Sequence, residues 1–156
     1  MLLSVIIATY NRSNVLKQNL DCFQNQTDKN FEVVIAIDGS TDNTVEMLKE
    51  YKSDFKIKWV DTKQTNKYCL AKARNMGLME CDGQAVAILD DDSFPVPDFV
   101  AAHKSSVRPK TLTGGYRNSL DPQDHLHAKM ARYIAGYGVL NPQKINNQLK
   151  NILVLR

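Results

Sequence analysis

Cysteine is scarce in this sequence, and the three residues that are present lie far apart. Cys22, Cys69 and Cys81 form no CxxC pair and are odd in number, a pattern that excludes a disulfide framework and a cysteine-based zinc site. Because thiols without disulfide partners are typical of reducing compartments, we expect the protein to be cytoplasmic.

Long hydrophobic runs and basic tracts are also absent. The N-terminal segment MLLSVIIATYN is too short to span a bilayer and lacks the basic region and cleavage site of a signal peptide, so we predict a strand there. The formal net charge is only +3 and is spread along the chain, so we expect no nucleic-acid partner. We expect no transmembrane segment, while peripheral association with a membrane surface stays open.

The sequence does contain alternating apolar and amphipathic segments through about its first 105 residues. Apolar residues make up 43% and charged residues 24% of the 156 positions, which is typical of a globular domain with a core. The alternation predicts an α/β fold, with a mostly parallel sheet and helices on both faces. In chain order, the predicted elements are a strand at 2–8, a helix at 11–23, a strand at 31–38, a helix at 39–51, a strand at 56–62, a helix at 67–83, a strand at 84–90 and a helix at 97–106.

The sequence after residue 110 shows a weaker pattern. Residues 111–118 suit a strand and a turn, residues 121–138 are expected to be helical in part, and residues 141–156 suit a helix capped by Asn141. The chain ends in the apolar segment ILVLR without a helix-stop signal, so we expect it to be a piece of a longer protein; the alternative is a C-terminal helix that docks on the domain.

Polar and acidic residues directly follow each predicted strand. Right-handed crossovers place the carboxyl ends of parallel strands on one edge of the sheet, where open α/β sheets bind their ligands. We therefore expect these residues to gather at one ligand-binding edge. They occupy positions 9–11, 38–40, 61–62 and 90–92.

Three consecutive aspartates end the fourth predicted strand. Because side chains alternate along a strand, Asp90 and Asp92 are expected on one side and Asp91 on the other. A D-x-D pair can bind one hard divalent cation, Mg²⁺ or Mn²⁺, if the phosphates of a substrate fill the remaining coordination positions. The alternatives are a solvated acidic loop, or Asp92 and Ser93 serving as turn or helix-cap residues.

Two further segments carry residues that suit a nucleotide. Asp38 follows the second strand, where its carboxylate can accept a hydrogen bond from a ribose hydroxyl or a base N–H; the alternative is a simple turn at Asp38 and Gly39. Arg74 lies on the third helix and can bind a phosphate with two hydrogen bonds; the alternative is a solvated helix face. Neither GxxxxGK[ST] nor GxGxxG occurs, which disfavours a P-loop and a dinucleotide-dependent oxidoreductase.

Four segments resemble, in order and spacing, the nucleotide-sugar-binding half of a family 2 glycosyltransferase: SVIIATYNR, FEVVIAIDGSTDNT, LAKARNMGL and AVAILDDDSFPVPDF. The resemblance covers about residues 1–105 and implies the Rossmann-like GT-A fold of nucleotide-diphospho-sugar transferases. It implies a hexosyltransferase-type enzyme that uses Mn²⁺ or Mg²⁺ to transfer a sugar from a nucleoside diphosphate sugar, most often a UDP-sugar. The acceptor would be a hydroxyl of a carbohydrate or another molecule. Residues 1–110 would form the nucleotide-sugar-binding region, and residues 111–156 the start of an incomplete acceptor-side region.

The resemblance also assigns roles to residues that match the family motifs by position. The aspartate run allows more than one alignment, which leaves open the residue that binds the metal directly; the predicted ligands are Asp90 and Asp92. By position, Thr9 and Tyr10 would line the base pocket, and Asp38 would contact the nucleoside. Arg74 would lie against the nucleotide. Asp90 and Asp91 would lie near the ribose or sugar, and Asp92 would hold the metal at the diphosphate.

The sequence departs from the family pattern at two places. Ile37 stands where the family usually has the first of two aspartates, so one nucleoside contact is expected to be missing. Family members that invert the anomeric carbon use a carboxylate base from the second half of the domain, often in an ED motif, and none follows residue 93. We expect an inverting reaction whose catalytic base is unidentified; the nearest substitutes are Asp121, Asp124 and His125.

Two alternative functions stay open. One is a non-catalytic module or fragment that binds nucleotide and metal without transferring a sugar. The other is a Mg²⁺-dependent phosphotransfer enzyme, since haloacid-dehalogenase-like and response-regulator proteins also carry aspartates at the ends of parallel strands. Their reactive aspartate usually follows an earlier strand, whereas the three aspartates here follow the fourth, which favours the glycosyltransferase.

Overall fold

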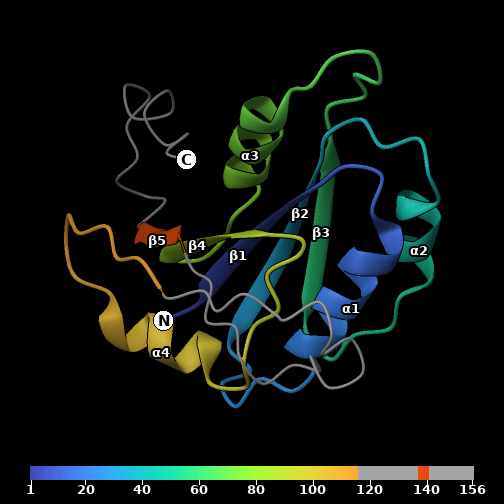
Figure 1. Cartoon of the computed structure of the whole chain (residues 1–156). Helices are drawn as coiled ribbons and strands as arrows, with labels where there is room; N and C mark the ends of the chain where they lie inside the picture. Colours follow the sequence, from blue (N-terminus) through green and yellow to red (C-terminus); the bar gives the residue numbers. More distant parts are fainter. Residues whose placement is uncertain (116–136, 141–156) are drawn as a thin grey trace, which may run out of the picture.

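The computed structural model describes residues 1–115 and 137–140, which are built around a five-stranded sheet. The strand order is β3-β2-β1-β4-β5; the first four strands pair in parallel, and β5 runs antiparallel to β4 (Figure 1). This arrangement confirms the predicted α/β fold. In these two ranges no helix has both the length and the apolar character that crossing a membrane requires. The elements are β1 (Leu3–Thr9), α1 (Ser13–Phe23), β2 (Phe31–Ile37), α2 (Thr44–Glu50), β3 (Lys56–Asp61), α3 (Leu70–Met79), β4 (Ala85–Asp90), α4 (Phe99–Ser106) and β5 (Tyr137–Leu140).

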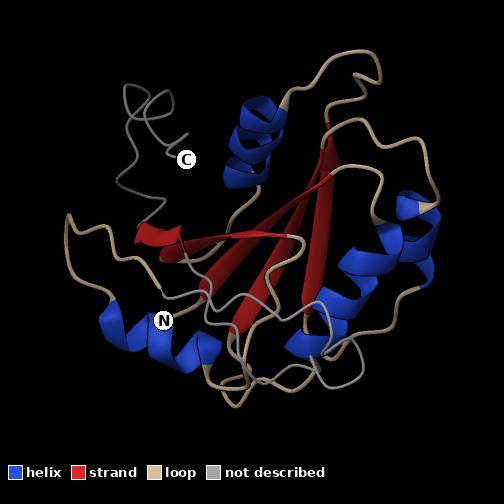
Figure 2. Cartoon of the chain, viewed as in Figure 1, coloured by secondary structure: helices blue, strands red, loops and turns tan. Residues whose placement is uncertain are grey.

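Helices cover both faces of the sheet, as the alternation predicted (Figure 2). The helices α1, α2 and α4 pack on one face, and α3 packs on the other. Along β1, Leu3, Val5 and Ile7 contact the first group, whereas Ile6 and Ala8 contact α3. A strand that is covered on both sides is apolar at nearly every position, which explains the near-continuous aliphatic run in the sequence.

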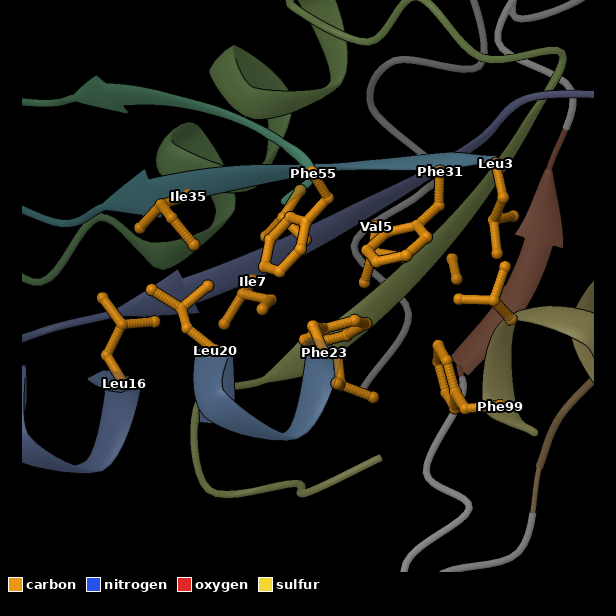
Figure 3. Close-up of a cluster of buried hydrophobic side chains, with 14 of the residues drawn as sticks. Leu3, Val5, Ile7, Leu16, Leu20, Phe23, Phe31, Ile35, Phe55 and Phe99 are labelled. Carbon is orange, nitrogen blue, oxygen red and sulfur yellow. The ribbon is translucent and has the colours of Figure 1, made fainter. Parts of the chain in front are cut away.

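An aromatic cluster fills the face that α1 and α4 cover (Figure 3). The ring centroid of Phe23 lies 5.6 Å from that of Phe31, 6.2 Å from that of Phe55 and 6.0 Å from that of Phe99. Leu20 is fully buried one turn before Phe23 on α1. Because each such side chain contributes roughly 1.5–3 kcal/mol when buried, this cluster holds the C-terminal end of α1 firmly against the sheet, near the amino ends of β2 and β3.

The loops that follow β1 and β2 are joined to each other by hydrogen bonds. The Oδ1 atom of Asn11 accepts the Thr41 N–H at 2.7 Å, and Asp42 Oδ2 accepts the N–H of Ser13, the first residue of α1, at 3.0 Å. The hydroxyl of Ser13 donates to Asn43. Asp42 therefore satisfies an N–H at the start of α1 that has no partner within the helix.

The third helix is shorter than the sequence predicted. It runs from Leu70 to Met79, whereas the predicted helix spanned 67–83 and ended at Gly83. Gly83 instead lies in the turn before β4, where a Cβ atom would come within 2.7 Å of the backbone nitrogen of Ser4. The glycine allows the turn to pack closely against β1.

The strand β5 was not predicted. Its range, Tyr137–Leu140, includes the last two residues of 121–138, a segment expected to be helical in part, so any helix there does not extend to 137–138. The strand forms by pairing with the edge of β4, a long-range contact that local periodicity does not contain. The remaining predictions for 116–136 and 141–156 lie outside the described residues.

Candidate functional site

A cleft of about 390 Å³ opens at the carboxyl edge of the sheet, where β1 and β4 end and α3 begins. The residues that follow the first and fourth strands meet there, as expected from the topology. Those at 38–40 and 61–62 do not line this cleft. The lining residues are Ala8, Thr9, Tyr10, Arg12, Tyr68, Leu70, Arg74, Asp90, Asp91 and Asp92.

Asp90, the last residue of β4, forms an ion pair with Arg74 of α3. The Nη2 atom of Arg74 donates to Asp90 Oδ1 at 2.6 Å. The Arg74 side chain is only 16% exposed and that of Asp90 is 33% exposed. The buried Nε of Arg74 has no hydrogen-bond partner in the part of the chain that the structure describes. The pair thus gives the cleft a firmly held positive charge beside a partly exposed carboxylate.

Asp91 lines the cleft, but its carboxylate is almost completely buried. Its carboxylate accepts the Thr9 hydroxyl at 2.8 Å and the Arg12 Nη1–H at 2.9 Å, and its side chain is 6% exposed. The register explains the first contact, because Ala8 pairs with Asp90 and the next residues of the two strands lie side by side. Burial raises the pKa of Asp91, against the opposing effect of both hydrogen bonds. The Thr9 hydroxyl is therefore bound to Asp91.

Asp92 is the most exposed of the three aspartates. Its side chain is 49% exposed, and its Oδ2 lies 3.1 Å from the same Arg12 nitrogen that binds Asp91. The strand ends at Asp90, and the Ser93 N–H donates to the Asp90 carbonyl across a turn, so strand alternation does not extend to Asp92. Asp91 and Asp92 both bind Arg12, whereas Asp90 binds Arg74, so the arrangement expected from strand alternation, with Asp90 and Asp92 together and Asp91 apart, is not what the contacts show.

The carboxylates suit a cation that is shared between protein and substrate. Among residues 1–115 and 137–140, no group of three or more His, Cys, Asp or Glu side chains is placed to hold a metal ion. Asp90 and Asp92 nevertheless offer two accessible carboxylates beside a cleft, and hard cations such as Mg²⁺ bind through one or two carboxylates plus substrate phosphates. These two residues fit that arrangement, and they do not fit a metal cage made by protein alone.

Asp38 is not among the residues that line the cleft. It is 1% exposed, and its Oδ2 accepts the backbone N–H of Cys69, directly before α3, at 2.8 Å. Gly39 follows with φ of +70°, and a Cβ atom there would come within 2.4 Å of the Gln64 carbonyl oxygen. Asp38 thus fixes the start of α3, and its contact with a nucleoside stays a prediction.

Sequence reasoning missed several residues of the site. Asn19 of α1 is fully buried, and its Nδ2 donates to the Asp91 carbonyl at 3.0 Å and to the Ser93 carbonyl at 2.8 Å. A signal was present, because an amide next to Leu20 on the apolar face of a helix needs a hydrogen-bond partner. Tyr68, which is 73% exposed in the cleft wall, was missed because it was read only as the start of the helix predicted at 67–83, whereas α3 begins at Leu70.

Arg12 was also missed, since it was read only as part of a predicted helix. The hydrogen bond to Asp91, and to a smaller extent the one to Asp92, raises the pKa of the Arg12 guanidinium above its ordinary value. Tyr10, which was predicted, lies beside it and is 43% exposed. Together with Arg74, the cleft therefore combines two guanidinium groups, exposed aromatic surface and a run of carboxylates.

Known proteins share this arrangement of sequence and fold. Chondroitin synthase of Escherichia coli is 37% identical over 128 residues, which cover 80% of this chain and 18% of that protein. The mannosyltransferase PcManGT from Pyrobaculum calidifontis, in complex with GDP-Man and Mn²⁺, is 28% identical, with a TM-score of 0.62 over 78% of this chain and 36% of that chain. S. aureus TarS 1–349, in complex with UDP-GlcNAc, is 28% identical, with a TM-score of 0.56 over 67% of this chain and 32% of that chain.

The chain spans less than a fifth of that chondroitin synthase and about a third of each of the two structures. The family model for glycosyl transferase family 2 matches residues 4–105, a range that includes every residue of the cleft wall. The α/β fold with its four parallel strands agrees with the GT-A-like fold of the structural neighbours. The chain belongs to glycosyl transferase family 2.

Proposed function

We propose that the chain is the donor-binding part of an enzyme that transfers a sugar from a nucleoside diphosphate sugar to an acceptor hydroxyl. The observation that carries this proposal is the cleft at the carboxyl edge of the sheet, where two arginines and two accessible carboxylates lie beside exposed tyrosines. Guanidinium groups suit a diphosphate, carboxylates suit a bridging cation, and aromatic rings suit a base or sugar face.

The donor is proposed to be a UDP-sugar that binds together with Mn²⁺ or Mg²⁺. The complexes of TarS with UDP-GlcNAc and of PcManGT with GDP-Man and Mn²⁺ support a nucleotide-sugar donor and a divalent cation. Tyr10 would pack against the base, and Arg74 would bind the nucleotide. Asp92 would hold the cation at the diphosphate, with Asp90 as the second ligand.

The residues of the cleft serve departure of the diphosphate. A bound cation supplies Lewis-acid stabilisation to the leaving phosphates. Arg74, held by Asp90, offers its positive charge on the same side without moving. Asn19 keeps the backbone of Asp91 and Ser93 in place, so the two exposed carboxylates stay oriented toward the donor.

The catalytic base is not assigned. An inverting reaction needs a group that removes a proton from the acceptor hydroxyl, and Asp121, Asp124 and His125 lie outside the described residues. Because the chain spans a third or less of chondroitin synthase and similar relatives, a module that binds the donor without transferring the sugar is the second candidate. The cytoplasmic location and the division near residue 110 stay predictions.

Nucleotide binding with and without metal tests the proposal. Isothermal titration with UDP, GDP and ADP, each with and without Mn²⁺, is expected to show one preferred nucleotide whose affinity rises with the metal. Asp92→Asn should abolish the metal-dependent part, whereas Asp54→Asn, at a similarly exposed position 54% accessible and paired with Lys29, should retain it. A folded protein that binds none of the three nucleotides would overturn the proposal. Transfer of sugar from the donor to an acceptor separates the enzyme from the binding module.

A further inference from the structure

Arg12 binds two aspartates through one nitrogen atom. Its Nη1 lies 2.9 Å from Asp91 Oδ1 and 3.1 Å from Asp92 Oδ2. The side chain is 51% exposed and lies in the cleft wall, in the loop between β1 and α1. The motif prediction gives Arg12 no role, and the proposed function counts it only as one of the two arginines of the cleft.

The two partners of Arg12 are held very differently. Asp91 is buried and also bound by the Thr9 hydroxyl, so its carboxylate is fixed. Asp92 is half-exposed, and Arg12 is the one side chain among the described residues that is shown binding its carboxylate. Arg12 can therefore release Asp92 while it remains attached to Asp91.

Arg12 also differs from Arg74, the other guanidinium of the cleft. Arg74 lies on the helix α3, is 16% exposed and pairs with a single aspartate, Asp90. Arg12 lies in a loop and is half-exposed. Movement of Arg12 away from Asp92 exposes no buried charge, because both groups already contact solvent. The exchange of partners at Asp92 consequently has a low desolvation cost.

We propose that Arg12 is a built-in counter-cation of Asp92, which a divalent cation displaces and which then binds the diphosphate of the donor. This inference rests on the proposed function, because it takes Asp92 as a metal ligand. Arg12 and the cation compete for one carboxylate, so the cation binds weakly when no nucleotide is present. A diphosphate gives the released guanidinium a new partner, so nucleotide and cation each strengthen binding of the other.

Binding of Mn²⁺, followed by the loss of the free-ion signal in electron paramagnetic resonance, tests this exchange directly. Without nucleotide, Arg12→Gln is expected to bind Mn²⁺ about tenfold more tightly than the natural protein, because a positive charge about 3 Å from the carboxylate is gone. With UDP present the order should reverse or the difference should vanish. The factor by which UDP strengthens Mn²⁺ binding is thus expected to fall.

Two further variants serve as controls. Arg108→Gln removes the same charge from a residue whose Nη1 donates to the backbone carbonyls of Ser105 and Val107, and it should match the natural protein. Arg12→Lys keeps the charge but loses the guanidinium fork, so its Mn²⁺ affinity without nucleotide should stay near the natural value. Circular dichroism establishes whether each variant is folded. If Arg12→Gln is not folded, the comparison is made with Arg12→Lys, for which the factor by which UDP strengthens Mn²⁺ binding should still fall.

The outcomes distinguish this inference from the proposed function. Unchanged or weaker Mn²⁺ binding by folded Arg12→Gln would overturn the inference, since Arg12 would then be neutral toward the cation or needed to orient the carboxylates. UDP binding that no divalent cation affects would also overturn it, yet would leave a metal-independent sugar transferase standing. Failure to bind any nucleotide would overturn the proposed function and this inference with it.

Discussion

Replacement of Asn19 by leucine is expected to destabilise the protein and to disturb the aspartate turn. The amide is fully buried and donates to the carbonyls of Asp91 and Ser93 at 3.0 and 2.8 Å. Leucine has the same branching and the same number of side-chain heavy atoms as asparagine, so the change removes the hydrogen bonds and leaves no cavity. The prediction therefore isolates the contribution of one buried amide to the position of the site.

The magnitude follows from the hydrogen bonds that change. Two buried carbonyls lose a donor, at a cost of about 1–3 kcal/mol each. The Oδ1 of Asn19 has no hydrogen-bond partner within the described part of the chain, so its removal offsets the cost of one such group. The net loss in the free energy of unfolding is about 2 kcal/mol, by the same per-group estimate.

Urea denaturation measures this loss, with extrapolation of the free energy of unfolding to water. Asn14→Leu is the matched control, because Asn14 is an exposed residue of the same helix, and its change should stay within about 0.5 kcal/mol. At a urea concentration where Asn19→Leu is still folded, UDP binding should be weaker than in the control. A loss below about 0.5 kcal/mol would refute the reasoning, since the two hydrogen bonds would then contribute nothing beyond what water provides.

Two further predictions concern the scaffold. Gly39→Ala should lower the free energy of unfolding by more than about 1 kcal/mol in urea denaturation, because φ is +70° and the new Cβ would lie 2.4 Å from the Gln64 carbonyl oxygen. Gly114→Ala is the control, because no atom of the described residues lies within 4 Å of its Cβ position, and it should not show this loss. Burial lowers the pKa of His103 in the folded protein. Below about pH 6.5 the unfolded chain therefore takes up a proton that the folded chain does not, and the free energy of unfolding decreases as the pH falls. His103→Gln should remove this part of the pH dependence of unfolding, and an unchanged profile would contradict the assignment.

The fold could be predicted because each strand carries its own signal. β1 and β2 are buried on both faces, so their sequences are aliphatic at nearly every position. The helix α1 places Leu20 and Phe23 on one face at helical spacing. By contrast, β5 depends on the free edge of β4, and no local pattern in Tyr137–Leu140 marks that partner.

The site could be predicted at the level of motifs but not of individual contacts. The aspartate run and Arg74 reach the cleft because strand ends and helix positions fix them. Asp38 has its carboxylate turned to the N–H of Cys69, which lies 31 residues away in sequence, and no spacing rule indicates that partner. Arg12 looks like an ordinary basic residue at a helix start until the turn after β4 brings two aspartates to it.

The three aspartates are tolerated at the end of a buried strand because each meets a different environment. Asp90 has its own arginine, Asp91 is buried with a hydroxyl and a shared guanidinium, and Asp92 faces solvent. Three carboxylates against two guanidinium groups leave one net negative charge, which a single divalent cation converts into one positive charge. An acidic motif can thus form part of a site for an anionic diphosphate, provided that the cation and the diphosphate bind together. If the proposed function holds, Asp92 is the aspartate whose neutralisation should change metal binding with the least effect on folding, because it is the most exposed of the three.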